Sequence, residues 1–129
     1  LAFAMIDIDE FKKVNDTYGH PIGDRILRSL SMFLKQRLRK TDHIGRYGGE
    51  EFAVILPNTS AQDARNVLND IRQRFSELQQ QAGEQEFRVS FSCGVASWQG
   101  DSAQSLCERA DQALYRSKEH GRNQISLAS

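Results

Sequence analysis

Two adjacent glycines, Gly48 and Gly49, stand between two short stretches, residues 44–47 and 52–56, that have the residue types of β-strands. Because glycine reaches positive φ without steric cost, the pair predicts a tight turn joining the stretches into a hairpin. Glu50 and Glu51 follow at the mouth of the second strand, where two like charges do not help folding. Such carboxylates suit a hard cation such as Mg²⁺, although a solvated hairpin tip with incidental acids gives the same pattern.

A second acidic cluster distinguishes these two interpretations. The apolar run that begins the chain ends in Asp7 and Asp9, and Phe11 and Lys12 follow directly. A strand tipped by these aspartates beside the glycine hairpin would let Asp7 and Glu50 share a metal ion. The turn over residues 9–13 would then offer main-chain N–H groups and lysine charge to phosphates. The pattern therefore favours phosphoryl or nucleotidyl transfer.

Composition limits the class of protein. A length of 129 residues suits one domain with one core, and 17 basic residues balance 17 acidic ones. A chain with no net charge lacks the excess of basic residues that binds the phosphate backbone of long nucleic acids, so no nucleic-acid partner is expected. The two cysteines, Cys93 and Cys107, lie in apolar patterns and are expected to be reduced in a cytoplasmic protein. No stretch is apolar enough to cross a bilayer, so no membrane contact is expected of this domain.

The hydrophobic periodicity predicts strands and helices in alternation. The expected strands cover residues 1–8, 44–47, 52–56, 87–95 and 123–127, and the expected helices cover residues 24–40, 60–78 and 102–118. Residues 79–86 are expected to be a polar loop, residues 9–13 to be a turn, and His20 to lie in a turn before Pro21. Asn15 and Asp16 are compatible with a further turn. Asp24 is then a candidate helix N-cap after Gly23, a role that is compatible with a place in a pocket. This order predicts an α/β (α+β) sandwich, with helices against a central, largely antiparallel sheet.

The chain resembles the GGDEF-domain diguanylate cyclases, in the variant whose signature reads Gly-Gly-Glu-Glu-Phe. The resemblance covers nearly the whole chain, and its motifs fall in family order: residues 7–9, 11–12, 15–20, 23–24, 46–52, 110–118 and 121–123. It implies a palm-like, ferredoxin-related fold. It also implies that two GTP molecules are condensed into cyclic di-GMP with release of pyrophosphate, a signalling reaction.

The resemblance assigns the metal ligands. Asp7, the Ile8 carbonyl and Glu50 would hold Mg²⁺, with Mn²⁺ able to substitute. Glu51 would orient or deprotonate the attacking 3′-hydroxyl or shape the field around the metals, and Asp9 is either a further ligand or a structural acid. Lys118 and Arg122 would bind phosphate, although basic residues near a helix C-terminus are also favourable without a ligand.

The resemblance also assigns the GTP pocket. Phe11 and Lys12 match the turn that meets the β- and γ-phosphates, and Gly48 and Gly49 lie against the nucleotide. Asn15 and Asp24 match the residues that read guanine, whose N–H groups a carboxylate and an amide oxygen accept. His20 is expected to have a structural or pocket-wall role.

A third group precedes the signature at the family's spacing. Arg39 and Asp42 resemble an Arg-x-x-Asp inhibitory site for cyclic di-GMP, in which arginine grips guanine O6 and N7. The arginine that often completes such a site from the next helix is not identifiable from the sequence. Taken alone, Arg39 and Asp42 are also compatible with the solvated end of a basic helix.

Three functions remain distinct at this stage. The first is a Mg²⁺-dependent cyclase that acts as a homodimer, because each domain holds one GTP. The second is a non-catalytic cyclic di-GMP receptor that binds through Arg39 and Asp42, and the third is a palm domain acting on nucleic-acid ends. The helix and Asp-x-Leu-Thr segment that open family domains are missing, so we expect residues 1–129 to be one domain lacking its first helix. An upstream sensory domain is expected, and upstream segments would allow the full-length protein to be anchored to a membrane.

Overall fold

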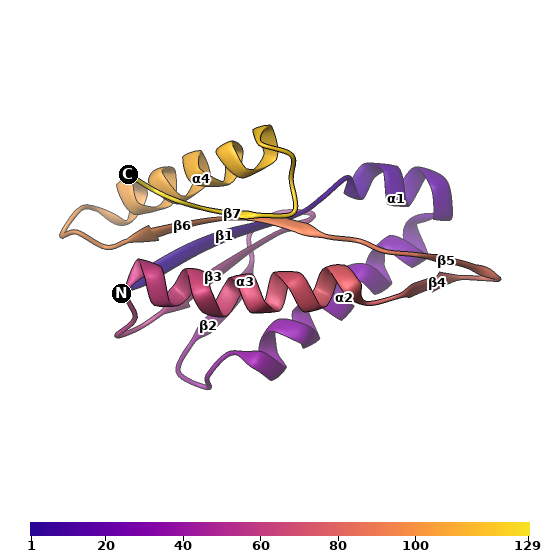
Figure 1. Cartoon of the computed structure of the whole chain (residues 1–129), viewed down its shortest axis with the longest axis horizontal. Helices are drawn as coiled ribbons and strands as arrows, with labels where there is room; N and C mark the ends of the chain where they lie inside the picture. Colours follow the sequence, from indigo (N-terminus) through magenta and orange to yellow (C-terminus); the bar gives the residue numbers. More distant parts are fainter.

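A single sheet with helices on both faces organises the protein. The computed structural model describes residues 1–129, and Figure 1 shows α4 on one side of the sheet and α2 and α3 on the other. The elements in chain order are β1 (Ala2–Ile8), α1 (Phe11–Tyr18), α2 (His20–Arg37), β2 (His43–Arg46), β3 (Glu51–Leu56), α3 (Ala61–Glu77), β4 (Gln80–Ala82), β5 (Gln85–Phe87), β6 (Phe91–Ser97), α4 (Ala103–Glu119) and β7 (Ile125–Leu127). The sandwich expected from the sequence is confirmed.

The five-stranded sheet has the order β2-β3-β1-β6-β7. Its pairings are antiparallel except for β6 with β7, which are parallel, as the prediction of a largely antiparallel sheet requires. The register places Asp7 at the end of β1 opposite Glu51 on β3 and Ser92 on β6. The two acidic motifs, 43 residues apart in the chain, therefore meet at one edge of the sheet.

The central strand β1 is buried along its whole length. Its alternate residues face opposite layers: Ala4 and Ile6 belong to the main core with α2 and α3, whereas Phe3 and Met5 pack with α4. Helix α4 lies so close to β6 that a Cβ on Gly94 would sit 2.2 Å from the Ala110 carbonyl oxygen. This close packing fixes the height of α4, and hence of Lys118, above the sheet.

The chain between β1 and β2 differs from expectation. The predicted turn over residues 9–13 continues into helix α1, because Phe11 and Val14 are spaced to bury one face of a helix. Helix α2 begins at His20, not at residue 24, since Pro21 is favourable in the first turn. Asp24 is therefore inside α2, and the N-cap interpretation is wrong. Gly19, at a φ of 94°, separates the two helices.

The prediction of a polar loop over residues 79–86 is also wrong. Strands β4 and β5 form a two-stranded ribbon turning at Gly83, which has a φ of 64°, and Figure 1 shows it projecting beyond α1. Phe87 belongs to β5, where its ring stacks on Tyr18 at a centroid distance of 4.2 Å, and β6 begins only at Phe91. None of the helices is both long and apolar enough to pass through a membrane.

Candidate active site

The loop that joins β2 to β3, residues 47–50, carries the glycine pair. The Tyr47 N–H donates to the Glu51 carbonyl at 2.9 Å, and Arg46 Nη2 donates to the Gly49 carbonyl at 2.7 Å. The hairpin is confirmed, but neither glycine adopts positive φ, so the conformational reason given for the pair is wrong. A Cβ on Gly49 would meet no atom within 4 Å. The protein itself therefore does not need a glycine there.

The carboxylates of this edge come from neighbouring strands. Because directly paired residues of antiparallel strands point to the same face, Asp7 and Glu51 share the α4 face of the sheet. The Ile8 N–H donates to the Glu50 carbonyl at 3.3 Å, which brings the Glu50 backbone to the same edge. The expected meeting of the two acidic motifs is present, with Glu51 as the residue directly opposite Asp7.

Burial shifts the ionisation of both carboxylates. Desolvation raises the pKa of Asp7, although its contact with the Lys118 ammonium opposes that rise. Desolvation and the nearby Asp7 charge raise the pKa of Glu51, and Asp111 on α4 contributes in the same direction. The net shift disfavours the charged form of both carboxyl groups, and the Lys118 ammonium offsets it only in part.

The residues at this edge fit a magnesium ion whose coordination is completed by oxygens of a substrate. The Asp7 and Glu51 carboxylates, the Glu50 carboxylate and the Ile8 carbonyl are all oxygen donors at one edge. No cluster of three or more His, Cys, Asp or Glu side chains comes together that would hold a metal unaided. Mg²⁺ characteristically takes one or two carboxylates plus substrate phosphates, so the sparse donor set fits that ion.

The start of α1 offers groups for phosphates. Glu10 is in the left-handed region with a φ of 53°, and the first helical bond is from the Val14 N–H to the Glu10 carbonyl. The N–H groups of residues 11–13 precede that bond and lack helical partners. Phe11 is buried, whereas the Lys12 side chain is 92% exposed and 3.5 Å from Asp16. Phe11 therefore anchors this turn, and Lys12 is free to reach a ligand.

The candidate guanine pocket lies between α1 and α2. The buried Asn15 Oδ1 has no hydrogen-bond partner. A Cβ on Gly23 would come within 1.8 Å of that oxygen, so glycine is required for the two helices to approach there. Asp24 follows directly and is exposed. The α1–α2 contact therefore brings Asn15 beside Gly23, the residue before Asp24, and leaves the Asn15 amide oxygen without a donor.

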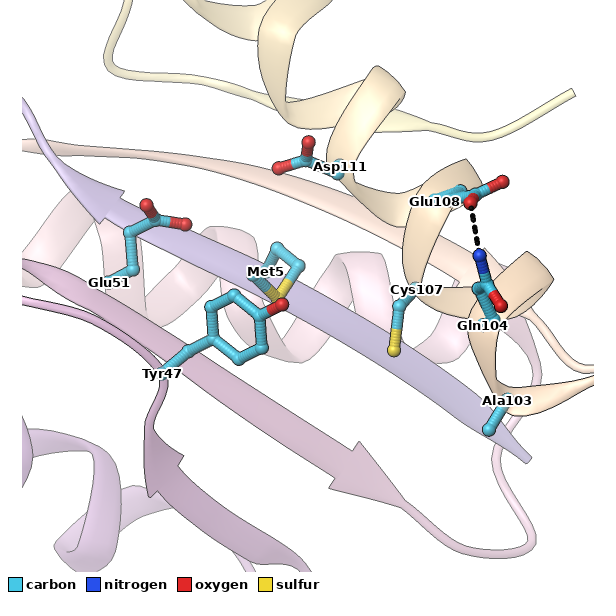
Figure 2. Close-up of a pocket in the computed structure, with 8 residues that line it drawn as sticks. All are labelled: Met5, Tyr47, Glu51, Ala103, Gln104, Cys107, Glu108 and Asp111. Carbon is cyan, nitrogen blue, oxygen red and sulfur yellow. Dashed lines mark hydrogen bonds between the residues drawn. The ribbon is translucent and has the colours of Figure 1, made fainter.

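A cavity of about 490 Å³ adjoins the edge on the α4 face (Figure 2). Figure 2 shows Tyr47, Glu51 and Asp111 on its walls, and the other lining residues are Met5, Ala103, Gln104, Cys107 and Glu108. None of the eight is basic, so this cavity is unsuited to a triphosphate. The phosphate-binding candidates lie instead at the α1 N-terminus and at Lys118 and Arg122.

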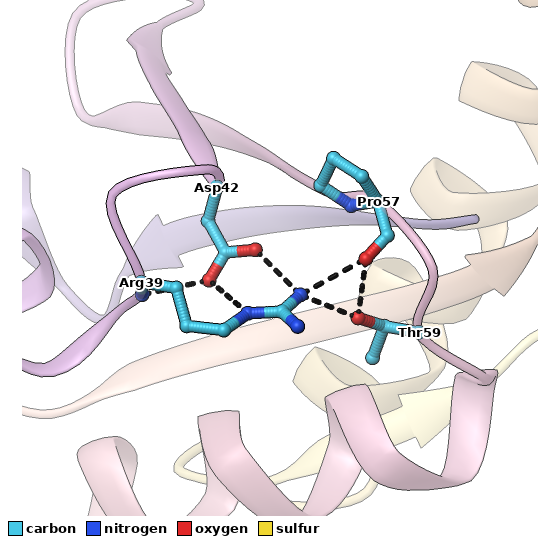
Figure 3. A network of polar contacts seen from close by, with 4 residues as sticks. All are labelled: Arg39, Asp42, Pro57 and Thr59. Atoms are coloured by element: carbon cyan, nitrogen blue, oxygen red, sulfur yellow. Dashed lines mark hydrogen bonds and ion pairs between the residues drawn. The ribbon is translucent and has the colours of Figure 1, made fainter.

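The second candidate site lies at the opposite end of the β2–β3 hairpin. Figure 3 shows the Arg39 guanidinium held by Asp42, Pro57 and Thr59. Its Nη2 donates to Asp42 Oδ1 at 2.9 Å, to the Pro57 carbonyl at 2.9 Å and to Thr59 Oγ1 at 2.7 Å. The Asp42 side chain is only 2% exposed, and both its oxygens accept from Arg39. Asp42 therefore orients Arg39 in this state, and a pocket of about 250 Å³ adjoins the pair.

Several polar contacts of this protein were not predicted from its sequence. Asp9 accepts from Ser90 Oγ at 2.7 Å, from Ser92 Oγ at 2.6 Å and from the Asn123 N–H at 3.0 Å. Asp111 belongs to a recognised motif, but its charge near Glu51 had not been predicted. Serines and an exposed main-chain N–H carry no periodic signal, so only the folded chain identifies them as partners.

Comparison with known proteins identifies relatives over the whole chain. The family described as diguanylate cyclase, GGDEF domain, matches residues 1–124. Diguanylate cyclase A of Treponema denticola is 46% identical over 130 residues, covering 99% of this chain and 35% of that protein. Diguanylate cyclase DgcP of Pseudomonas aeruginosa is 40% identical over 129 residues, covering 99% of this chain and 19% of that protein. The chain thus spans about a third or less of each of these curated relatives.

The solved structures that resemble this protein belong to the same family as the relatives found by sequence. The GGDEF domain of DgcB from Caulobacter crescentus, solved in complex with c-di-GMP, superposes with a TM-score of 0.91 at 37% identity, covering 98% of this chain and 76% of that one. The active GGEEF domain of a diguanylate cyclase from Vibrio cholerae gives a TM-score of 0.91 at 36% identity, covering 99% and 82%. The second of these has the same Gly-Gly-Glu-Glu-Phe signature as residues 48–52.

Proposed function

This chain belongs to the GGDEF-domain family, and on that premise we propose that it is the catalytic domain of a diguanylate cyclase. It condenses two GTP molecules into cyclic di-GMP and releases two pyrophosphates. The observation that carries the proposal is the meeting of Asp7 with Glu51, beside the Ile8 and Glu50 backbones, at the edge where α1 begins. In this proposal the carboxylates bind the metal ion, the free N–H groups bind the phosphates, and the guanine pocket binds the base of the same nucleotide.

The guanine end of the nucleotide occupies the space between α1 and α2. The Asn15 Oδ1 atom, buried without a partner, accepts from an N–H group of the base, and Asp24 accepts a second. Adenine lacks the N1–H and the N2 amine, so it would leave both acceptors unsatisfied. The pocket therefore selects GTP over ATP.

The phosphates extend from this pocket towards the edge of the sheet. The N–H groups at the start of α1 and the Lys12 ammonium bind the β- and γ-phosphates, and Lys118 and Arg122 approach from the other side. Mg²⁺ held by Asp7, Glu50 and the Ile8 carbonyl would stabilise charge on the α-phosphate and acidify the attacking hydroxyl. Gly48 and Gly49 have no side chains that would obstruct the nucleotide.

Each half-reaction needs two domains. The 3′-hydroxyl of one GTP attacks the α-phosphorus of the GTP on the partner domain, forming a P–O bond as the bond to pyrophosphate breaks. Glu51, whose pKa is raised, is suited to accept the hydroxyl proton. Lys118 and Arg122 balance the charge of the departing pyrophosphate. Because one domain holds one nucleotide, a monomer cannot complete the ring.

The direct test is product formation. The full-length protein is incubated with GTP and Mg²⁺, and the products are separated by chromatography. The expected result is cyclic di-GMP and pyrophosphate in a 1:2 ratio, with a rate per domain that rises with protein concentration. The control is Glu50→Gln, which keeps the size of the side chain and removes its charge. No cyclic product at any concentration would contradict the proposal.

A second function is favoured by the Arg39 pocket. The solved DgcB domain is in complex with c-di-GMP, and Arg39, held by Asp42, lies beside a pocket of about 250 Å³. In a cyclase this pocket serves product inhibition, and in a protein without turnover it makes the domain a cyclic di-GMP receptor. Binding of cyclic di-GMP without conversion of GTP would favour the receptor.

A further inference from the structure

The turn between α4 and β7 carries backbone strain. Gly121, Arg122 and Asn123 have φ angles of 112°, 63° and 47°, so three consecutive residues adopt left-handed or related conformations. Glycine does so freely and asparagine tolerates it, but arginine does not favour it. Such a run persists only when the surrounding structure holds it in place.

Two side chains from distant elements hold this turn. The Asp9 carboxylate, at the end of β1, accepts the Asn123 N–H at 3.0 Å. Arg72 on α3 donates through Nη1 to Asn123 Oδ1 at 2.7 Å and to the Asn123 carbonyl at 3.2 Å. The main-chain N–H, main-chain carbonyl and side-chain oxygen of Asn123 are therefore all bonded to residues outside the turn.

The same contacts connect the turn to the start of α1. Asp9 also accepts from Ser90 and Ser92 on the β6 side, at 2.7 and 2.6 Å, so its carboxylate cannot rotate without breaking three hydrogen bonds. Glu10, Phe11 and Lys12 follow Asp9 directly. This carboxylate thus links the α1 N-terminus directly to the turn that carries Arg122.

Arg122 itself is held only by its backbone. Its N–H donates to the Ser117 carbonyl at 3.0 Å, and its carbonyl accepts from Gln124 Nε2 at 3.1 Å. Its side chain is exposed and enters no ion pair. The contacts of Asp9 and Arg72 with Asn123 therefore fix the backbone position from which the unpaired Arg122 guanidinium projects.

We propose that Asp9, Arg72 and Asn123 are positioning residues that clamp the Gly121–Asn123 turn and present Arg122 to the substrate phosphates. This rests on the proposed function, since it takes Arg122 as a phosphate ligand. The clamp keeps Arg122 at a fixed spacing from the N–H groups of α1, so the two sides of the phosphate site bind one nucleotide together. Arg72 acts only through Arg122 and touches no substrate.

A double-mutant cycle tests the dependence of Arg72 on Arg122. Binding of a non-hydrolysable GTP analogue is measured by calorimetry for wild type, Arg72→Met, Arg122→Ala and the double variant. We expect Arg122→Ala and Arg72→Met each to weaken binding about five- to tenfold, and the double variant to be within about twofold of Arg122→Ala alone. Losses that multiply would overturn the proposal, because they would show that Arg72 acts independently of Arg122.

Arg74→Met is the matched control. Arg74 lies on the same helix but pairs only with Asp70 on the exposed surface, so its loss should leave analogue binding unchanged. Asn123→Ala removes the Oδ1 acceptor without changing α3, and it should reproduce the Arg72→Met effect should that variant prove unstable. Unchanged binding in folded Arg72→Met or Asn123→Ala would overturn the proposal.

Amide hydrogen exchange separates failure of the clamp from failure of the proposed function, because it needs no ligand. Exchange at residues 121–124 should accelerate at least about fivefold in Arg72→Met and remain unchanged in Arg74→Met. Equal exchange in both variants would overturn the clamp. Absence of analogue binding in wild type, with the exchange difference intact, would instead overturn the GTP assignment and leave the clamp standing.

Discussion

The two ends of the β2–β3 hairpin differ in how far their polar groups are satisfied. At the glycine-loop end, burial raises the pKa of Asp7 and Glu51, and between α1 and α2 the buried Asn15 Oδ1 has no partner. At the opposite end, Arg39 bonds with Asp42, Pro57 and Thr59, and both Asp42 oxygens are occupied. At the first end, Lys118 is the only cation paired with the two carboxylates, whereas a ligand at the second end would have to replace hydrogen bonds that Arg39 and Asp42 already make.

This difference has an energetic consequence. A ligand that supplies a partner to a buried, unsatisfied group removes a penalty of about 1–3 kcal/mol, whereas exchanging one hydrogen bond for another gains much less. Substitutions at the glycine-loop end should therefore have large functional effects, and substitutions at the Arg39 end smaller ones.

The largest effect is expected for Glu50→Gln. Removing one carboxylate from the proposed metal edge keeps the volume and loses the charge, so turnover of GTP should fall at least about 100-fold. Steady-state production of cyclic di-GMP measures the change, and the melting temperature confirms that the variant is folded. Turnover within about twofold of wild type would remove Glu50 from the metal site and leave Glu51 as the carboxylate that faces Asp7.

Base selectivity should be the next largest effect. ATP would leave Asn15 and Asp24 without donors, a loss of two hydrogen bonds that corresponds to about 2–4 kcal/mol, or roughly 30- to 1,000-fold in affinity. Competition between GTP and ATP for the protein measures it. Asn15→Ala should reduce the selectivity because no unsatisfied acceptor remains there. Equal affinity for both nucleotides would show that the space between α1 and α2 is not the base pocket.

At the Arg39 end, a smaller effect is expected. Loss of a two-pronged arginine contact corresponds to roughly 1–3 kcal/mol, so Arg39→Ala should bind cyclic di-GMP at least about tenfold more weakly. Initial rates should stay near those of wild type, while progress curves should lose their product inhibition. Calorimetry measures the affinity for cyclic di-GMP, and progress curves measure product inhibition. Equal product affinity in wild type and Arg39→Ala would mean that Arg39 and Asp42 only close the hairpin end.

The smallest effect concerns the stability contribution of Glu51. Because its pKa is raised in the folded state, the ionised carboxylate disfavours folding, and stability falls as pH rises through the folded-state pKa. Glu51→Gln should therefore raise the melting temperature by about 1–4 °C at pH 8 in chelator, and the gain should shrink in acid. Thermal melts across that pH range measure it, and a lower melting temperature at pH 8 would contradict it.

The sequence carried much of the fold on its own. Alternation along β3 and β6 and the helical spacing of Leu30 and Leu34 in α2 are periodic signals that any packed layer requires. It also carried the site motifs, because Asp7 and Glu50 are charged residues at the mouths of apolar strands. The shorter elements were missed: α1 has only two buried residues, Phe11 and Val14, which is too few for a clear periodic signal, and Phe87 of β5 packs through its stacking on Tyr18.

The sequence motifs were enough to predict the chemistry that we propose for this protein, whereas the contacts between particular atoms came from the folded structure. Residue type alone predicted carboxylates for a cation and an amide for a base. Strand register, however, made Glu51 the partner of Asp7, and helix packing at Gly23 left the Asn15 oxygen without a donor. Asp9 and Arg72 reach Asn123 across 114 and 51 residues of chain. No local pattern encodes such contacts, because the fold alone brings distant residues within hydrogen-bonding distance.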